Sequence, residues 1–303
     1  MVAAGASSPP SRPALRTMCL CLAALWGAHA GSGVTIPASG HVPARVTPPA
    51  PRAAAGPGGG GGSGHVVVPV AGRPPRPGIP WFLTIGDSIT FGYTRDPALA
   101  GTNITWALRL ERMLAAQGRP WRLYDTACPG ETTLTYAARC PGWRTVPLLA
   151  AESQRSAALD AIAADGAGLR LVVVALGSND LLQQLNGDPA TTQADLLTHL
   201  EAILDELRAA APAVPIVVAD SYDPFALGAP HTDEVLTPID DAIGALAARL
   251  GDGFADFHAA VNHPADGAPL CRLIDCADLD IHPTALGQDR LSEAVMRAIP
   301  PPA

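Results

Sequence analysis

The chain has 303 residues, of which 48 % are hydrophobic, and its formal net charge is −8, with twenty arginines and no lysine. The hydrophobic content is ample for a sizeable core. The charge argues against nucleic-acid binding, because counterion release needs clustered basic residues and these arginines are scattered along the chain. Basic residues that are all arginine, together with abundant alanine, glycine and proline, are typical of a GC-rich bacterial coding sequence.

The first thirty residues have the pattern of a signal peptide. Arg12 and Arg16 precede an apolar segment at residues 18–26, and the small residues of Ala28-His29-Ala30 suit cleavage after Ala30. The apolar segment is too short to span a bilayer. We therefore expect residues 1–30 to be removed, and the mature protein to be secreted without stable insertion in a membrane.

Residues 31–78 consist largely of glycine, proline, alanine, serine and valine, and they include the glycine run 58–62. Such a composition cannot bury enough apolar surface to offset the entropy lost on ordering. We expect a disordered linker here. It separates the signal peptide from a single folded domain at residues 79–303.

Within that domain, short apolar runs alternate with longer amphipathic segments, and both types of pattern can be placed along the chain. The predicted strands are 81–85, 122–125, 169–176, 214–219 and 253–257, and the predicted helices are 106–117, 148–164, 193–210, 237–250 and 284–299. The run at 169–176 is continuously hydrophobic, as expected for a parallel strand that is covered on both faces. The alternation predicts an α/β fold, a three-layer α/β/α sandwich around a mostly parallel sheet of five strands.

Four residues that could carry chemistry follow these strands or precede the last helix. Ser88 lies in Gly86-Asp87-Ser88-Ile89-Thr90 after the first strand, Gly130 follows the second strand, and Asn179 follows the third. His282 precedes the last helix in Asp-Ile-His-Pro-Thr. Ligands of such sheets bind at the carboxyl ends of the strands, so all four residues are expected at one edge of the sheet.

Ser, Gly, Asn and His in this order resemble the SGNH (GDSL) hydrolase family, whose fold is flavodoxin-like. The resemblance implies a serine esterase or lipase that works through an acyl-serine intermediate without a cofactor. Ser88 would be the nucleophile and His282 its base, because an unassisted serine hydroxyl is a poor nucleophile at neutral pH. The oxyanion hole would consist of the backbone N–H groups of Ser88 and Gly130 and the side-chain amide of Asn179.

The sequence departs from the family pattern at the third member of the triad. The family commonly has an aspartate three residues before the histidine, and that position is Leu279 here. Asp278 and Asp280 flank it. We expect Asp280 to orient His282, with Asp278 or a backbone carbonyl as the alternatives.

Removal of the signal peptide would leave four cysteines, and an even number in an exported chain suggests disulfides. Three pairings are possible, and the shortest loops result from pairing Cys128 with Cys140 and Cys271 with Cys276. A zinc site made of all four lacks the usual Cys-x2-Cys spacing.

No other metal site is expected, because Asp256, His258 and His263 lack a known ligand spacing. The segments 134–138 and 225–227 are candidates for an apolar acyl pocket, and His231 could border it. The substrate could be a small-molecule, lipid or glycan ester, and we expect a monomer. A carbohydrate O-acetyl esterase, an acyltransferase and a noncatalytic exported binding module remain as alternatives.

Overall fold

The computed structural model describes residues 76–94, 105–141, 153–185, 192–229, 231–276 and 280–300. All of them belong to one structural unit, His65–Ala303. The expected signal peptide, its cleavage point and the linker as far as residue 75 lie outside the described residues. Within the described ranges, no helix has both the length and the apolar character that crossing a bilayer requires.

Five strands form one sheet, and every pairing between neighbours is parallel. The strands are β1 (Trp81–Gly86), β2 (Arg122–Asp125), β3 (Leu169–Ala175), β4 (Ile216–Ala219) and β5 (Gly253–Ala255). Their order is β2-β1-β3-β4-β5, which is the order of flavodoxin-like sheets. The chain reverses its direction of winding between β1 and β3, so the carboxyl ends of these two strands flank the crevice where such folds bind ligands.

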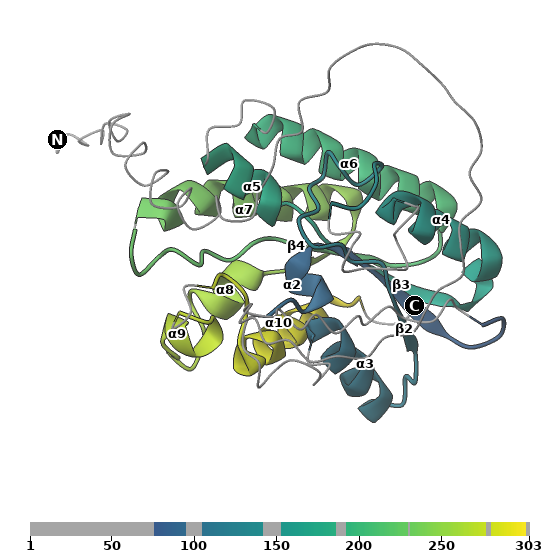
Figure 1. Cartoon of the computed structure of the whole chain (residues 1–303). Coiled ribbons are helices and arrows are strands. Elements are labelled where there is room, and N and C mark those ends of the chain that lie inside the picture. The colour runs from purple at the N-terminus through teal and green to yellow at the C-terminus, as the bar shows by residue number, and fades with distance from the viewer. Residues whose placement is uncertain are drawn as a thin grey trace, which may run out of the picture. The chain divides into compact units, whose positions relative to one another are not determined.

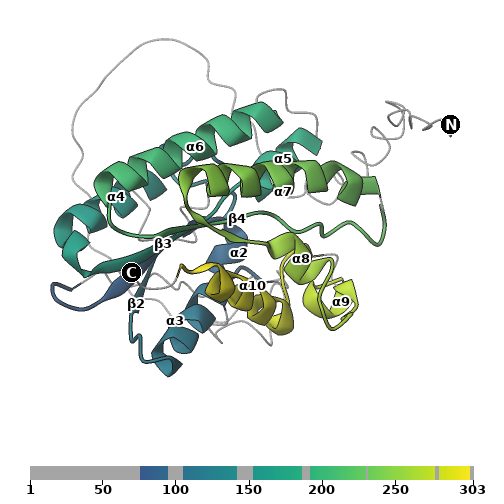
Figure 2. The same ribbon diagram turned by 180° about the vertical axis from the view of Figure 1, so that it is seen from behind.

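One face of the sheet is covered by the helices α4 (Gln154–Asp165), α5 (Ser178–Leu185), α6 (Gln193–Ala210) and α7 (His231–Leu250). This layer lies above the sheet in Figure 1 and is seen from behind in Figure 2. Leu83, Val172 and Val218 project into it and share a core with Leu200 and Leu204 of α6. A short 3₁₀ helix, η2 (Gly166–Gly168), connects α4 to β3.

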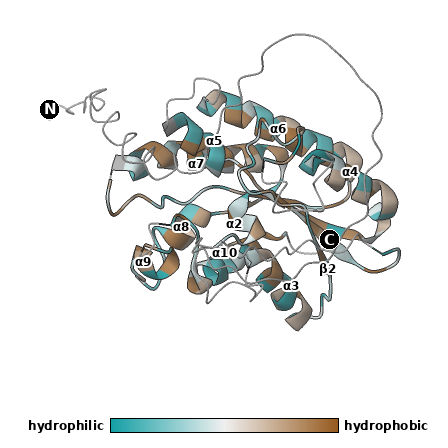
Figure 3. Cartoon of the chain, viewed as in Figure 1, coloured by the Kyte–Doolittle hydropathy of each residue, from teal (hydrophilic) through white to brown (hydrophobic). Residues whose placement is uncertain are grey.

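The other face is covered by α3 (Trp106–Ala116), α8 (Phe257–Val261), α9 (Leu270–Leu273) and α10 (Ala285–Ala298). Phe82, Leu171 and Val217 alternate with the residues that face the first layer, and they pack with Leu110 of α3 and Leu291 of α10. In Figure 3 the hydrophobic sides of the helices face the sheet and hydrophilic residues colour their outer sides. The predicted three-layer sandwich is confirmed.

The structure corrects several predicted boundaries. Residues 148–152 of the predicted helix lie outside the described residues, and α4 begins at Gln154 because Ser153 caps its amino end. Helix α7 begins at His231 and not at Thr237. Pro238 therefore lies inside the helix and not in its first turn. The helices α2 (Ser88–Phe91), α8 and α9 are too short for hydrophobic periodicity to reveal them.

Candidate active site

Ser88 lies where β1 ends and the short helix α2 begins. The preceding Asp87 caps this helix, since its Oδ1 accepts a hydrogen bond of 2.9 Å from the backbone N of Ile89. Gly86 makes the turn possible, because a Cβ there would clash with Thr90 Oγ1. The turn leaves Ser88 partly exposed while its neighbours Asp87 and Ile89 are buried.

Ser88, His282 and Asp280 form a continuous hydrogen-bonded chain. His282 Nε2 lies 2.9 Å from Ser88 Oγ, and His282 Nδ1 lies 2.5 Å from Asp280 Oδ1. When the imidazole carries its proton on Nδ1, the ring donates to Asp280 and accepts from the serine hydroxyl. The ring also packs against Tyr93, with ring centroids 4.8 Å apart. The alternative carboxylate, Asp278, lies outside the described residues, as does Leu279.

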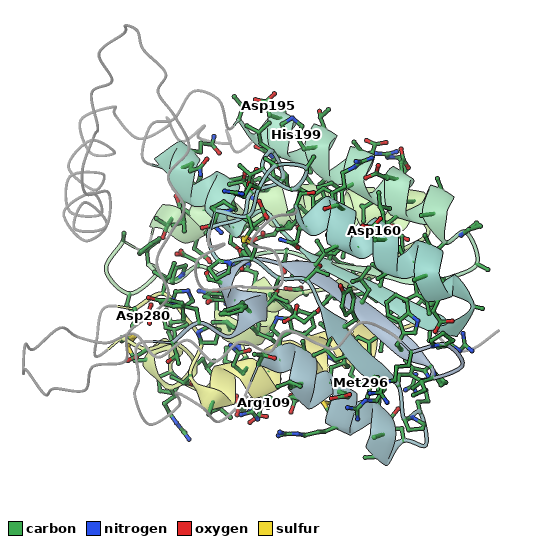
Figure 4. The ribbon with its side chains drawn as sticks, turned by 45° about the vertical axis from the view of Figure 1, so that its right-hand side comes forward. Arg109, Asp160, Asp195, His199, Asp280 and Met296 are labelled. Carbon is green, nitrogen blue, oxygen red and sulfur yellow. A yellow bond between two sulfur atoms is a disulfide. The ribbon has the colours of Figure 1, made fainter. Side chains whose placement is uncertain are left out.

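The segment that presents Asp280 and His282 is folded back on itself between α9 and α10. The backbone N of Asp280 donates to the carbonyl of Asp275, and the N of Asp275 donates to the carbonyl of His282. The disulfide between Cys271 and Cys276 lies at the base of this segment, with a Cα–Cα distance of 5.1 Å. These bonds fix the backbone that carries Asp280 and His282. Figure 4 labels Asp280.

Gly130 and Asn179 meet at the same edge of the sheet. Gly130 has a φ of 82°, a left-handed conformation that glycine adopts without strain. The side-chain amide of Asn179 donates a 2.9 Å hydrogen bond to the carbonyl of Glu131 and lies 3.4 Å from Asp87 Oδ2. Asn179 is the second residue of α5 and therefore does not cap that helix. Its side chain instead holds the backbone beside Gly130.

Two further contacts secure the turn that contains Gly130. Asp180 accepts hydrogen bonds from the backbone N of Thr133 at 2.9 Å and from the Thr133 hydroxyl at 2.5 Å. The disulfide between Cys128 and Cys140 closes the same loop, with a Cα–Cα distance of 5.9 Å. Among the described residues, both disulfides have the shortest-loop pairing.

A buried polar bridge that the sequence did not reveal joins this turn to β1. The side chain of Gln154 forms two hydrogen bonds of 2.8 Å with Gly86, one to its backbone N and one to its carbonyl. Gln154 Nε2 also donates to Glu131 Oε2 at 3.2 Å, and Glu131 accepts from the hydroxyl of Thr135. Gln154 and Glu131 are both fully buried. The bridge therefore fixes the distance between the Ser88 turn and the Gly130 turn.

Buried carboxyl groups surround the site. Burial raises the pKa of Glu131 to about 7, against hydrogen bonds from Thr135 and Gln154 that lower it. Burial also raises the pKa of Asp87 to about 6, although the backbone hydrogen bond from Ile89 and the nearby His282 lower it. The pKa of Asp180 is raised for the same reason.

A small apolar pocket of about 30 Å³ lies next to the segments that carry Ser88 and His282, although neither of these two residues lines it. Ile89 and Ile281, the chain neighbours of Ser88 and His282, contribute to it together with Leu181, Leu182, Tyr222, Phe225 and Leu236. Of the two apolar segments, Phe225 lines this pocket, whereas Leu134 and Leu227 are 51 % and 66 % exposed.

Comparison with known proteins places this geometry in a family. Among solved structures, a GDSL-like lipase from Parabacteroides merdae is 18 % identical, with a TM-score of 0.54, over 74 % of this chain and 98 % of the other. A catalytic mutant of an acetylxylan esterase from Geobacillus stearothermophilus is 17 % identical, with a TM-score of 0.52, over 75 % of this chain and 96 % of the other. These likenesses show the fold alone, and a comparison with curated proteins gave no match. The model of the GDSL-like lipase/acylhydrolase family, however, matches residues 84–290, from β1 into α10, so the chain belongs to that family and is a carboxylic ester hydrolase.

Proposed function

We propose that the chain is an exported serine esterase that removes short acyl groups, with Ser88 as nucleophile, His282 as general base and Asp280 as the orienting carboxylate. The observation that carries the proposal is the hydrogen-bonded chain of these three side chains, with distances of 2.9 Å and 2.5 Å. A nucleophile, a base in contact with it and a carboxylate that orients the base are the parts that acyl transfer needs.

In the first step, Ser88 Oγ forms a bond to the ester carbonyl carbon while its proton passes to His282 Nε2. The carbonyl oxygen becomes an oxyanion. The tetrahedral intermediate then loses the alcohol, which takes the proton from His282 as it leaves, and Ser88 is left acylated. In the second step a water molecule gives its proton to His282 and attacks the acyl-serine, and the collapse of this intermediate returns the proton to Ser88 and releases the acid.

The oxyanion is stabilised by the backbone N–H groups of Ser88 and Gly130 and by the side-chain amide of Asn179. The hydrogen bond from Asn179 to the carbonyl of Glu131 uses one of its two N–H groups and brings the amide beside Gly130. The second N–H has only a long contact of 3.4 Å with Asp87, which the oxyanion can replace. Loss of one such donor typically costs about 10² to 10³ in turnover.

The size of the apolar pocket supports a short acyl group. Its volume of about 30 Å³ accommodates roughly two or three water-sized spheres. An acetyl or propionyl group fits this space, whereas a palmitoyl chain does not. An acetyl group on a carbohydrate would fit equally well, and one of the solved structures with a similar fold is described as an acetylxylan esterase.

Export is supported by two observations. The amino-terminal residues 1–30 have the composition of a signal peptide. The two disulfides require an oxidising compartment to form and persist.

The experiment compares the purified chain with its Ser88→Ala variant on p-nitrophenyl esters from acetate to palmitate. Thr198→Ala, which removes an exposed hydroxyl on α6, is the matched control. We expect the highest kcat/KM on acetate or propionate, a loss of at least about 10³-fold in Ser88→Ala, and no change in the control.

Three outcomes would contradict parts of the proposal. Activity that survives in Ser88→Ala would overturn the nucleophile, and a preference for palmitate would overturn the short acyl pocket. Faster transfer of the acyl group to an added alcohol than to water would indicate the acyltransferase. Release of acetate from acetylated xylan, measured beside the chromogenic esters, would identify the carbohydrate O-acetyl esterase within the proposed class.

A further inference from the structure

Asp233, His258 and His263 form a cluster that the proposed ester hydrolysis does not use. His258 Nε2 lies 2.6 Å from Asp233 Oδ1, and His263 Nε2 lies 3.7 Å from Asp233 Oδ2. The possible ligand atoms of the three residues all lie within 4.8 Å of one another. The sequence suggested Asp256 as the carboxylate near these histidines, but Asp256 caps α8 through Ala259. Asp233, from the first turn of α7, takes its place.

A second carboxylate lies behind the cluster. Asp240 Oδ2 is 3.6 Å from His258 Nδ1, is buried, and has no hydrogen bond in the described part of the chain. A histidine that binds a metal through one ring nitrogen usually donates its other N–H to a carboxylate, which fixes the tautomer and the ring orientation. The carboxylate of Asp240 is placed to accept the Nδ1–H of His258. The lone pair of His258 Nε2 then faces Asp233 and His263.

The charges of the cluster also favour a cation. Among the described residues, the carboxylate of Asp233 faces the rings of His258 and His263, and that of Asp240 faces the ring of His258. Asp223, which is fully buried, lies close enough to interact electrostatically with Asp233 and His258. None of these carboxylates is paired with an arginine in the described ranges. The two imidazoles can balance the negative charge of the carboxylates only when they are protonated, whereas a divalent ion would balance it directly.

We propose that Asp233, His258 and His263 bind a divalent transition-metal ion of the zinc class, with water in the fourth position. Two imidazole nitrogens and one carboxylate oxygen suit zinc, cobalt or nickel, whereas calcium and magnesium prefer sites made of oxygen alone. Bonds of about 2.0 to 2.2 Å in a tetrahedral site separate neighbouring ligand atoms by about 3.3 Å. The distance between His258 and Asp233 is shorter than this and the distance between His263 and Asp233 is longer, so small side-chain movements suffice. His263 is 62 % exposed, which gives the ion a path from solvent.

The position of the site indicates what the ion does. Thr232 and Asn262, the chain neighbours of Asp233 and His263, both hold Asp223: the hydroxyl of Thr232 donates to its carboxylate, and Asn262 forms two hydrogen bonds with its backbone, at 2.9 Å and 2.8 Å. The residues on either side of Asp223, Tyr222 and Pro224, line the apolar pocket. An ion at the cluster ties α7 to α8 and thereby stabilises the loop that forms one wall of that pocket.

The test is titration of the chelator-treated, untagged chain with zinc chloride, followed by calorimetry and by thermal unfolding. Every protein carries Cys19→Ser and Cys21→Ser, so that free thiols cannot bind the ion. The variants are His263→Ala, which removes an exposed ligand without opening the core, and Asp240→Asn, which removes the carboxylate behind His258. His199→Ala is the matched control, since His199 lies on α6, where Figure 4 labels it, outside the cluster.

We expect one zinc ion per chain with a dissociation constant in the micromolar range or below. Zinc at about 100 times that constant should raise Tm by about 5 to 10 °C. His263→Ala should weaken binding by at least about 100-fold and Asp240→Asn by about 10- to 100-fold, with no change in His199→Ala. Cobalt should give the visible absorption of a tetrahedral site in the parent chain and not in His263→Ala.

The absence of binding at about 100 µM zinc would overturn the proposal, and it would leave hydrogen bonding of His258 between two carboxylates as the explanation of the cluster. Binding that His263→Ala leaves unchanged, or that His199→Ala weakens equally, would overturn it as well. Because Ser88→Ala should show the same zinc binding and the same rise in Tm, failure of the proposed esterase chemistry can be distinguished from failure of the metal site.

Discussion

Replacing Gln154 with leucine tests whether the bridge between the Ser88 turn and the Gly130 turn positions the proposed oxyanion hole. Leucine has a similar volume but removes all three hydrogen bonds of the side chain. The backbone N of Gly86 and the carboxyl of Glu131 each lose a partner, whereas the carbonyl of Gly86 still accepts from the backbone N of Cys128 at 2.9 Å. The substitution therefore takes one hydrogen bond from each of three buried groups, and the main cost falls on the backbone N of Gly86 and on Oε2 of Glu131.

Each buried group that loses its partner costs about 1 to 3 kcal/mol, so the free energy of unfolding should fall by about 2 to 6 kcal/mol. At about 2 to 4 °C per kcal/mol for a domain of this size, a fall of about 4 kcal/mol lowers Tm by about 8 to 16 °C. Movement of the Gly130 turn by a fraction of an ångström should also lower kcat by about 10- to 100-fold. KM should change little, because the oxyanion forms only in the transition state.

The assay is steady-state hydrolysis of p-nitrophenyl acetate, at a temperature where circular dichroism shows each variant to be folded. Gln193→Leu is the matched control, since Gln193 is the first residue of α6 after a capping box, as Gln154 is in α4. The double variant Gln154→Glu with Glu131→Gln exchanges the two side chains, so that position 131 now donates the hydrogen bond and position 154 accepts it. This double variant should recover part of the kcat that Gln154→Leu loses. If Gln154→Leu lowers Tm but keeps the kcat of Gln193→Leu, the bridge stabilises the fold without positioning the site.

Three further predictions concern other parts of the site. Asp280→Asn should lower kcat by about 10⁴-fold on p-nitrophenyl acetate while Asp278→Asn leaves it unchanged, and equal losses in the two variants would contradict Asp280 as the orienting carboxylate. Burial raises the pKa of Glu131 from 4.5 to about 7, so the folded state keeps this proton to a higher pH than the unfolded state. The contribution of the protonated group to the free energy of unfolding is therefore complete below pH 4.5 and is lost as the pH rises through 7. The free energy of unfolding, measured with urea, should therefore fall less between pH 4.5 and pH 8 in Glu131→Gln than in the parent chain, by about 3 kcal/mol. Equal falls in the two proteins would refute this prediction. Replacing Cys128 and Cys140 with serine opens a loop whose ends are 12 residues apart and should cost about 3 kcal/mol, and an unchanged Tm in calorimetry would contradict this.

Much of the fold followed from local patterns in the sequence. The continuous hydrophobicity of β3 predicted a strand covered on both faces, and the regular stripe of leucines in α6 predicted its buried side. The alternation of strands and helices then predicted the sheet, because right-handed crossovers leave few ways to connect such elements. Ser88, Gly130 and Asn179 could be assigned to one edge of the sheet for the same reason.

The carboxylate beside His282 illustrates what local patterns leave open. Asp278 and Asp280 lie four and two residues before His282, and the family position, Leu279, falls between them. The hydrogen bonds of Asp275 with Asp280 and with His282 fold the segment so that Asp280 reaches the ring. This choice depends on how the loop closes, and spacing along the chain does not contain that information.

The sequence by itself determined the sheet and the long helices that cover it, because hydrophobic periodicity is a local property. It also singled out Ser88 and His282, whose side chains the structure places 2.9 Å apart. Only the tertiary structure decided that Gln154 bridges Gly86 and Glu131 and that Asp233 joins His258 and His263. Those partners are 68, 23 and 25 residues apart. Contacts of that kind arise when packing of the whole core brings distant segments together, and a polar residue inside a helix carries no local sign of the partner it will meet.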